Sequence, residues 1–218
     1  MNESLHVIKS VGLQPCSMAD LNRAVAVLSS GGVVAFPTET YYGLAVDPFN
    51  PLALNHLFAL KQRDINKPIL TLVDDRESLL TLVQSVPAQY TALMDKFWPG
   101  PLTLIFPARL NLPTLLTAGT STIGVRQSSH PFARQLLRAF GKPITATSAN
   151  ISGRSAAVDA FEVKAQFGSK IDLIFDGGKT PGTGGSSIIR LEGDKLKLIR
   201  EGIIPFAEIL KVSAAIAG

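Results

Sequence analysis

The sequence has little of what marks a secreted or membrane protein. Its single cysteine, Cys16, can form no intrachain disulfide and has no second cysteine at metal-ligand spacing. Residues 1–12 carry charged side chains and lack the apolar core of a secretory signal. The stretch 25–42 is interrupted by glycines, Pro37 and Glu39, whereas a membrane span needs roughly 20 apolar residues. We therefore expect a cytoplasmic protein without membrane contact.

Charged residues are also scarce, at 17% of the chain against roughly 25% in average soluble proteins. The 21 basic and 17 acidic side chains give a net charge of +4, so the position of the cations matters more than their sum. With 218 residues, 46% of them hydrophobic, the chain can bury about 70% of its unfolded surface without disulfides or a structural metal. Disorder is excluded, and no internal repeat or linker is visible. The sequence therefore predicts one domain over residues 1–218.

Helical and strand patterns alternate along the chain. Ser17 and Asp20 form an N-terminal cap before an apolar pattern that two glycines end, and a buried strand is expected at 33–36. Asn50 and Pro51 open a second helix. Further strands are predicted at 69–73, 102–106, 123–125, 144–147, 173–175, 187–191 and 196–200, and further helices at 75–83, 87–97, 131–140, 158–167 and 205–215. The fold class is α/β, with a twisted, mostly mixed sheet flanked by helices, because the last two strands must form a hairpin.

Polar residues follow two of the predicted strands. The segment 37–44 holds two threonine hydroxyls, a carboxylate and two phenols at a strand end, where ligands bind in open α/β sheets. A tight turn explains it about equally well. Ser148 and Asn150 suit a phosphate or a base edge, and a plain turn suits them equally. Ser148 lacks the Gly-x-Ser-x-Gly context of an esterase nucleophile. Residues 178–180 resemble the end of a phosphate loop, but the glycine that such a loop needs is missing.

Cations recur near predicted element ends. Lys61, Arg63 and Lys67 form the densest cluster. Lys61 and Arg63 can converge on one anion only if the helix ends there, and a solvated helix terminus is the better explanation from charge pattern alone. Arg126 and Arg200 each follow a predicted strand, and each alone is more often a surface arginine.

Taken together, these segments resemble the YrdC-like family of threonylcarbamoyl-adenylate synthases. The resemblance rests on seven motifs in order: Pro-Thr-Glu-Thr-x-Tyr-Gly-Leu from Pro37, Lys61-x-Arg63, Pro-Gly-Pro-Leu-Thr from Pro99, Val125-Arg126, Ser148-x-Asn150, Asp-Gly-Gly from Asp176, and Arg200-x-Gly202. It implies the short, single-domain form, with helices and a sheet around a large basic cavity. It also implies an enzyme that joins L-threonine, bicarbonate and ATP into threonylcarbamoyl-AMP, releasing pyrophosphate, for N6-threonylcarbamoyladenosine at position 37 of tRNAs.

The resemblance also implies roles for individual residues. A catalytic clamp on the triphosphate is expected from Lys61 and Arg63. ATP binding is expected from these two residues and from Lys67, Thr122, Ser148, Asn150 and Arg200. Threonine binding is expected from Thr38, Arg126, Ala146 and Ser186. No protein-held metal is implied, Mg²⁺ shares the pyrophosphate charge, and the loop 177–185 excludes water.

Two departures from the family pattern occur. Tyr41 replaces a more usual valine, and the sequence around Ser186 differs from that of many members, which leaves the contacts of Ser186 open.

Two other functions remain open. One is a binding module for tRNA or double-stranded RNA without chemistry, which an isoelectric point near 9.3 permits. Scattered lysines and arginines and the lack of an aromatic RNA-binding motif argue mildly against it. The other is a carbamoyl-transfer domain like that of hydrogenase-maturation proteins, which normally sits in a much longer chain. Contact with tRNA and with proteins of the later transfer step is expected only from the resemblance.

Overall fold

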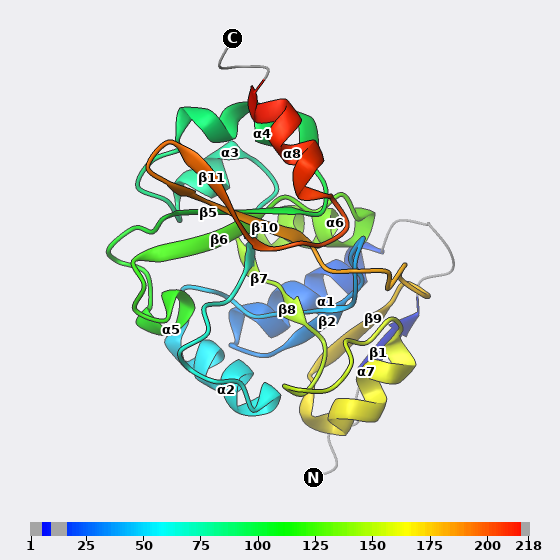
Figure 1. Ribbon diagram of the computed structural model, residues 1–218. Coiled ribbons are helices and arrows are strands. Elements are labelled where there is room, and N and C mark those ends of the chain that lie inside the picture. Colours follow the sequence, from blue (N-terminus) through cyan, green and yellow to red (C-terminus); the bar gives the residue numbers. More distant parts are fainter. Residues whose placement is uncertain (1–5, 10–16, 215–218) are drawn as a thin grey trace.

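The computed structural model describes residues 6–9 and 17–214, in which helices surround two β-sheets (Figure 1). The five-stranded sheet has the order β1-β9-β2-β3-β8, with bounds His6–Lys9, Leu173–Asp176, Val34–Phe36, Gly43–Ala45 and Thr147–Ser148. The six-stranded sheet has the order β11-β10-β5-β6-β4-β7, with bounds Lys195–Arg200, Ser187–Glu192, Leu102–Pro107, Thr122–Arg126, Thr71–Leu72 and Ile144–Thr145. Both sheets contain parallel and antiparallel pairs. The mixed α/β fold is confirmed, but two sheets replace the single sheet expected.

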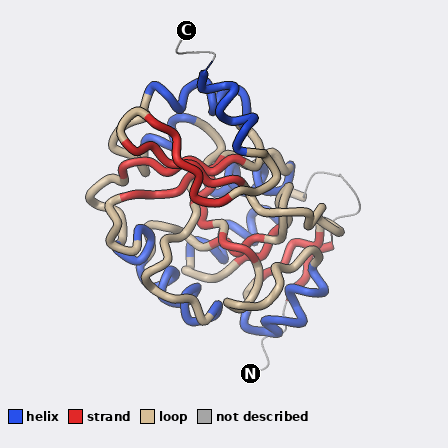
Figure 2. The backbone as a smooth tube through the Cα atoms, viewed as in Figure 1, coloured by secondary structure: helices blue, strands red, loops and turns tan. Residues whose placement is uncertain are grey.

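Helices pack around these sheets (Figure 2). They are α1 (Met18–Ser29), α2 (Pro51–Lys61), α3 (Arg76–Leu80), α4 (Ala88–Phe97), α5 (Thr114–Thr117), α6 (Pro131–Phe140), α7 (Ala160–Phe167) and α8 (Phe206–Ala214), with a 3-10 turn at Gly168–Lys170. Both predicted caps are present. The Ser17 side chain accepts from the Asp20 amide, and Asn50 Oδ1 accepts from the amides of Leu52 and Ala53 at 3.0 and 3.2 Å. The starts of α1 and α2 are therefore fixed locally by their sequence.

The two sheets share buried apolar packing. One cluster joins residues of both sheets, including Leu44 and Phe106, and Tyr90 packs edge-on against Phe106 with ring centroids 5.0 Å apart. A second cluster joins the five-stranded sheet to α1 and α6, where Phe132 lies edge-on to Phe175 at 5.7 Å. Burying such rings contributes about 1.5–3 kcal/mol each. This packing fixes the positions of the two sheets relative to each other.

Three predicted elements differ from the structure. The strand expected at 144–147 divides into β7 and β8 at Ala146, whose amide donates to the Leu70 carbonyl at 2.8 Å, so this segment serves both sheets. The helix expected at 75–83 ends at Leu80. The segment expected to be a loop after Pro37 contains β3, whose three residues are too short to show an alternating pattern.

Two further observations concern the cellular setting. None of the helices within residues 6–9 and 17–214 is long and apolar enough to cross a bilayer. Cys16 and most of the amino-terminal segment, on which the absence of a disulfide and of an export signal was argued, lie outside the described residues. The cytoplasmic location therefore stays a prediction.

Candidate active site

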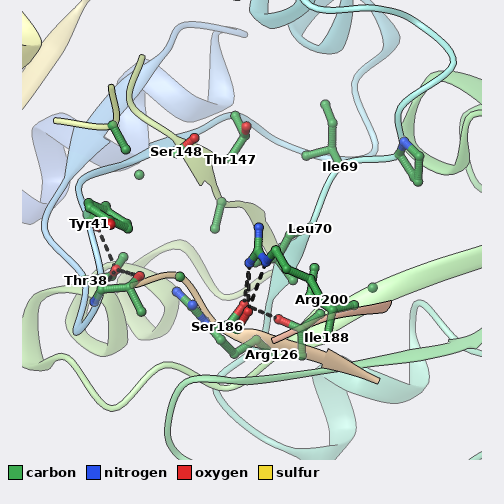
Figure 3. Close-up of a pocket in the computed structure, with 18 of the residues that line it drawn as sticks. Thr38, Tyr41, Ile69, Leu70, Arg126, Thr147, Ser148, Ser186, Ile188 and Arg200 are labelled. Atoms are coloured by element: carbon green, nitrogen blue, oxygen red, sulfur yellow. Dashed lines mark hydrogen bonds between the residues drawn. The ribbon is translucent and has the colours of Figure 1, made fainter. Parts of the chain in front are cut away.

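A cavity of about 560 Å³ lies where the ends of several strands meet (Figure 3). The turn after β2, the loop that follows α2 and strands from both sheets line it. Its charged lining consists of four arginines and one glutamate: Arg63, Arg126, Arg154, Arg200 and Glu201. Cations that are far apart in the sequence thus share one hollow, as the motifs predicted.

All predicted site residues except Lys61 and Lys67 line this cavity: Thr38, Arg63, Thr122, Arg126, Ala146, Ser148, Asn150, Ser186 and Arg200. The structure therefore brings these predicted residues together around one cavity. The individual role of each residue remains a prediction, since position in the lining does not show what a residue binds.

Lys61 is the clearest departure from expectation. Its side chain is 1% exposed and is absent from the cavity lining. The ammonium donates to the carbonyls of Ser148 and Asn150, the latter at 2.6 Å, and the Lys61 carbonyl accepts from the Ser152 amide at 2.8 Å. Burial, followed by repulsion from Arg63, lowers the pKa of Lys61 from its usual 10.5 to about 7. In this structure Lys61 holds the 148–152 loop in place and does not line the cavity. Its role in a triphosphate clamp stays a prediction.

The helix does end at Lys61, as convergence of the two cations required. Gln62 adopts a left-handed backbone with φ of 51°. Arg63 then turns to the carbonyls of Lys67 and Pro68, with donor distances of 3.3 and 2.9 Å. Lys61 and Arg63 therefore donate to different pairs of backbone carbonyls, and of the two only Arg63 lines the cavity. Lys67 contributes its carbonyl to this arrangement, while its side chain lies outside the lining.

Arg126 ends β6 and is 3% exposed. Its Nε lies 3.7 Å from Glu39 Oε1, and the other Glu39 oxygen accepts from the Ser128 hydroxyl. Burial lowers the pKa of Arg126, and Glu39 opposes that change by stabilising the charged form. Because arginine side chains stay protonated in proteins, the guanidinium is a cation here. It is a buried cation facing a cavity, suited to a small carboxylate.

Arg200 ends β11 and lies over Ser186 (Figure 3). Its Nη2 donates to the Ser186 carbonyl at 2.8 Å and approaches the Ser186 hydroxyl at 3.3 Å, and that hydroxyl pairs with Thr103 Oγ1 at 2.8 Å. A Cβ at Gly202 would lie 2.2 Å from the Gly185 carbonyl oxygen. Glycine is required at 202 because the backbone that follows Arg200 passes directly against the backbone of residues 185–187, which leads into β10.

The Ser148–Asn150 loop is held by its own hydrogen bonds. Ser148 Oγ donates to Asn150 Oδ1 at 2.5 Å. Asn150 Nδ2 donates to the carbonyls of Ile151 and Arg154 at 3.0 and 2.9 Å, so both amide hydrogens are used within the loop. Asn150 thus shapes the wall of the cavity. The Ser148 oxygen keeps acceptor capacity toward the cavity.

The turn after β2 presents hydroxyls to the cavity. Thr38 Oγ1 donates to the Tyr41 carbonyl at 2.7 Å and lies 2.9 Å from Thr40 Oγ1. Both threonines are buried. Thr38 Oγ1 also accepts from the Thr40 amide at 3.1 Å. With its proton on the Tyr41 carbonyl it must accept from the Thr40 hydroxyl as well, so its hydrogen-bonding capacity is used within the turn.

The loop 177–185, expected to exclude water, is tied to the fold at several points. Tyr42 OH donates to the Gly178 carbonyl at 2.8 Å and accepts from the Gly177 amide at 3.1 Å. The Thr180 amide donates to the Val158 carbonyl at 2.8 Å. Of this loop only Gly185 lines the cavity. Its role as a cover stays a prediction.

Sequence reasoning missed Arg154, which lines the cavity four residues after Asn150. It belongs to no motif used above, and it is exposed. The one available signal was a basic residue shortly after a polar strand end. In the part of the chain that the structure describes, no group of three or more His, Cys, Asp or Glu side chains could hold a metal ion.

Comparison with known proteins identifies the family. The model of the Sua5/YciO/YrdC domain, described as "Telomere recombination", matches residues 26–202. The chain belongs to the Sua5/YciO/YrdC family. A relative from Vibrio cholerae named threonylcarbamoyl-AMP synthase is 39% identical over 84% of this chain and 97% of its own length. One of the same name from Pyrococcus abyssi is 37% identical over 87% of this chain, which spans 56% of that relative.

A solved structure agrees with the fold. The crystal structure of P. abyssi Sua5 complexed with L-threonine matches with a TM-score of 0.89 and 34% identity, covering 95% of this chain and 60% of that one. The chain is thus similar to the larger part of a protein that binds L-threonine. The expected YrdC-like fold is confirmed.

Proposed function

We propose that this protein is an L-threonylcarbamoyladenylate synthase, a nucleotidyltransferase built as one YrdC-like domain. It joins L-threonine, bicarbonate and ATP into threonylcarbamoyl-AMP for the N6-threonylcarbamoyladenosine modification of tRNA. The observation that carries the proposal is the convergence of Arg63, Arg126 and Arg200 on one cavity, beside the threonine hydroxyls that follow β2. Relatives named for this activity support it.

Threonine is placed at the Arg126 end of the cavity. The planar guanidinium can hold the substrate carboxylate with two parallel hydrogen bonds. Ser186 offers its oxygen to the amine or hydroxyl of threonine, and Thr38 and Ala146 form the wall beside it. The hydrogen bond to Thr103 already fixes the orientation of the Ser186 hydroxyl, so this hydroxyl is held in place for a substrate.

ATP is placed across the rest of the cavity. Arg63 and Arg200 sit where they can stabilise charge that develops on the phosphate oxygens, with Arg154 as a third cation. Ser148 and Thr122 supply hydroxyls to the nucleotide, and Asn150 supports the Ser148 loop. The site fits Mg²⁺ only as an ion carried by ATP itself, because Glu201 is the one carboxylate in the lining.

The reaction needs no covalent nucleophile from the protein. The threonine nitrogen bonds to the carbon of bicarbonate with loss of water, and an oxygen of the resulting carbamate bonds to the α-phosphorus. The bond from that phosphorus to the pyrophosphate oxygen breaks, and pyrophosphate leaves. Carbamates decompose in water, so the buried position of Arg126 and Ser186 serves to hold the intermediate away from solvent.

The test is a product analysis. Purified protein is incubated with ATP, Mg²⁺, bicarbonate and L-threonine, and threonylcarbamoyl-AMP is sought by mass spectrometry, with serine and no-threonine controls. The proposal predicts the adduct and threonine-dependent pyrophosphate release. Tight RNA binding without ATP turnover would contradict it and favour the binding-module function. Contact with tRNA and with transfer-step proteins stays a prediction.

A further inference from the structure

Glu39 is a partly buried carboxylate that the proposed mechanism does not use. It stands between Thr38 and Thr40 in the turn after β2, and both of these threonines line the cavity while Glu39 does not. Its side chain is 14% exposed. Keeping a carboxylate here requires compensation, because an ionised group taken out of water is costly unless it is paired.

The partner of Glu39 is Arg126. Glu39 Oε1 and Arg126 Nε face each other at 3.7 Å, and neither atom has a hydrogen-bond partner within residues 6–9 and 17–214. This separation is about 0.8 Å longer than an ordinary N–H···O bond. The pair is therefore an ion pair with one unformed hydrogen bond, and the Arg126 guanidinium can shift toward or away from the turn.

The other side of Glu39 is anchored. Glu39 Oε2 accepts from the Ser128 hydroxyl, and Ser128 Oγ in turn accepts from the His130 amide at 3.2 Å. His130 caps α6 through its ring Nδ1, which accepts from the Phe132 amide at 3.2 Å. The carboxylate is thus fixed to the start of a ten-residue helix and offers its free oxygen to Arg126.

The charges around Arg126 also favour a second carboxylate. Arg200 lies close enough to disfavour the charged form of Arg126, while Glu39 favours it. Arg126 thus has one carboxylate and one further guanidinium near it. A substrate carboxylate entering the cavity would balance the remaining positive charge, and Arg126 would bind it through the nitrogens that do not face Glu39.

We infer that Glu39 is a positioning residue that sets the direction of the Arg126 guanidinium and so determines affinity for the threonine carboxylate. This inference rests on the proposed function. Glu39 acts through Arg126 and does not touch the substrate, so its effect belongs to threonine binding alone.

The test is steady-state kinetics on Glu39→Gln in the full chain, following threonine-dependent pyrophosphate release. The amide keeps the shape but removes the charge. We expect the KM for threonine to rise about tenfold, with kcat within about twofold and the KM for ATP unchanged. The matched control is Glu192→Gln, which removes an exposed carboxylate that pairs with Arg190 and Lys197, and no kinetic change is expected.

A double-mutant cycle separates positioning from general damage. In an Arg126→Lys background, Glu39→Gln should raise the threonine KM by less than about twofold, because the guanidinium that Glu39 orients is absent. The same tenfold rise in both backgrounds would overturn the inference. If Glu39→Gln fails to fold by thermal melting, Ser128→Ala, which frees the anchored oxygen, should raise the threonine KM by about threefold.

Different results would overturn the proposed function and the role of Glu39. Wild-type protein without threonine-dependent pyrophosphate release would overturn the proposed function and this inference with it. An active wild type whose Glu39→Gln variant keeps its threonine KM would overturn only the role of Glu39.

Discussion

The buried Lys61 amine makes a quantitative prediction for stability against pH. Its folded-state pKa is about 7, while the unfolded chain has the usual 10.5. The unfolded state therefore binds more protons between these values, and stability must rise as pH increases through this window. Taking the two pKa values, Lys61 contributes a gain of about 2 kcal/mol between pH 7 and pH 9. The neutral amine still donates to the carbonyls of Ser148 and Asn150, so these bonds survive the titration.

The measurement is urea unfolding of wild type and Lys61→Met at pH 7 and pH 9. Methionine has similar length and no titrating group, so all other ionisations cancel in the difference. The stability of wild type relative to Lys61→Met should increase by about 2 kcal/mol from pH 7 to pH 9. Lys197→Met, which removes a half-exposed lysine beside Glu192, is the control and should show no such change. If the stability of wild type relative to Lys61→Met stays constant or falls between pH 7 and pH 9, the lowered pKa of Lys61 is refuted.

Three further changes have defined outcomes. Arg63→Ala should lower threonine-dependent pyrophosphate release by at least about a hundredfold, and near-normal turnover would exclude it from the phosphate clamp. Gly202→Ala places a methyl group 2.2 Å from the Gly185 carbonyl oxygen and should lower the free energy of unfolding in urea by about 1–3 kcal/mol. An unchanged stability would show that the segments carrying these two glycines can move apart. Tyr42→Phe removes the hydroxyl that bridges the two glycines following β9 and should cost about 1–3 kcal/mol, whereas an unchanged midpoint would show that water replaces it.

Much of the fold was predictable because its signals are local. Asn50 and Pro51 predict the start of α2, and the hairpin of β10 and β11 follows from the four residues between its predicted strands. The division into two sheets was not predictable. It depends on the break at Ala146, whose amide bonds to Leu70, a partner distant in sequence. Short strands such as β3 carry too few residues for a periodic signal.

The site shows the same division. Each of Arg126 and Arg200 ends a strand, which alone favours a surface arginine, and only the family resemblance predicted that they share a site. The different destinations of Lys61 and Arg63 were not identifiable from a motif that names them together. They depend on the left-handed backbone of Gln62 and on which carbonyls lie within reach after folding. A cation in a motif can therefore bind backbone carbonyls of a neighbouring loop instead of lining the cavity.

A crystal structure of the protein with L-threonine and a non-hydrolysable ATP analogue tests the central claim most directly. The account predicts the threonine carboxylate on the Arg126 guanidinium and the phosphates beside Arg63 and Arg200, with both ligands in the one cavity. Ligands bound on another face of the molecule, with these three arginines making no contact to either, would contradict it.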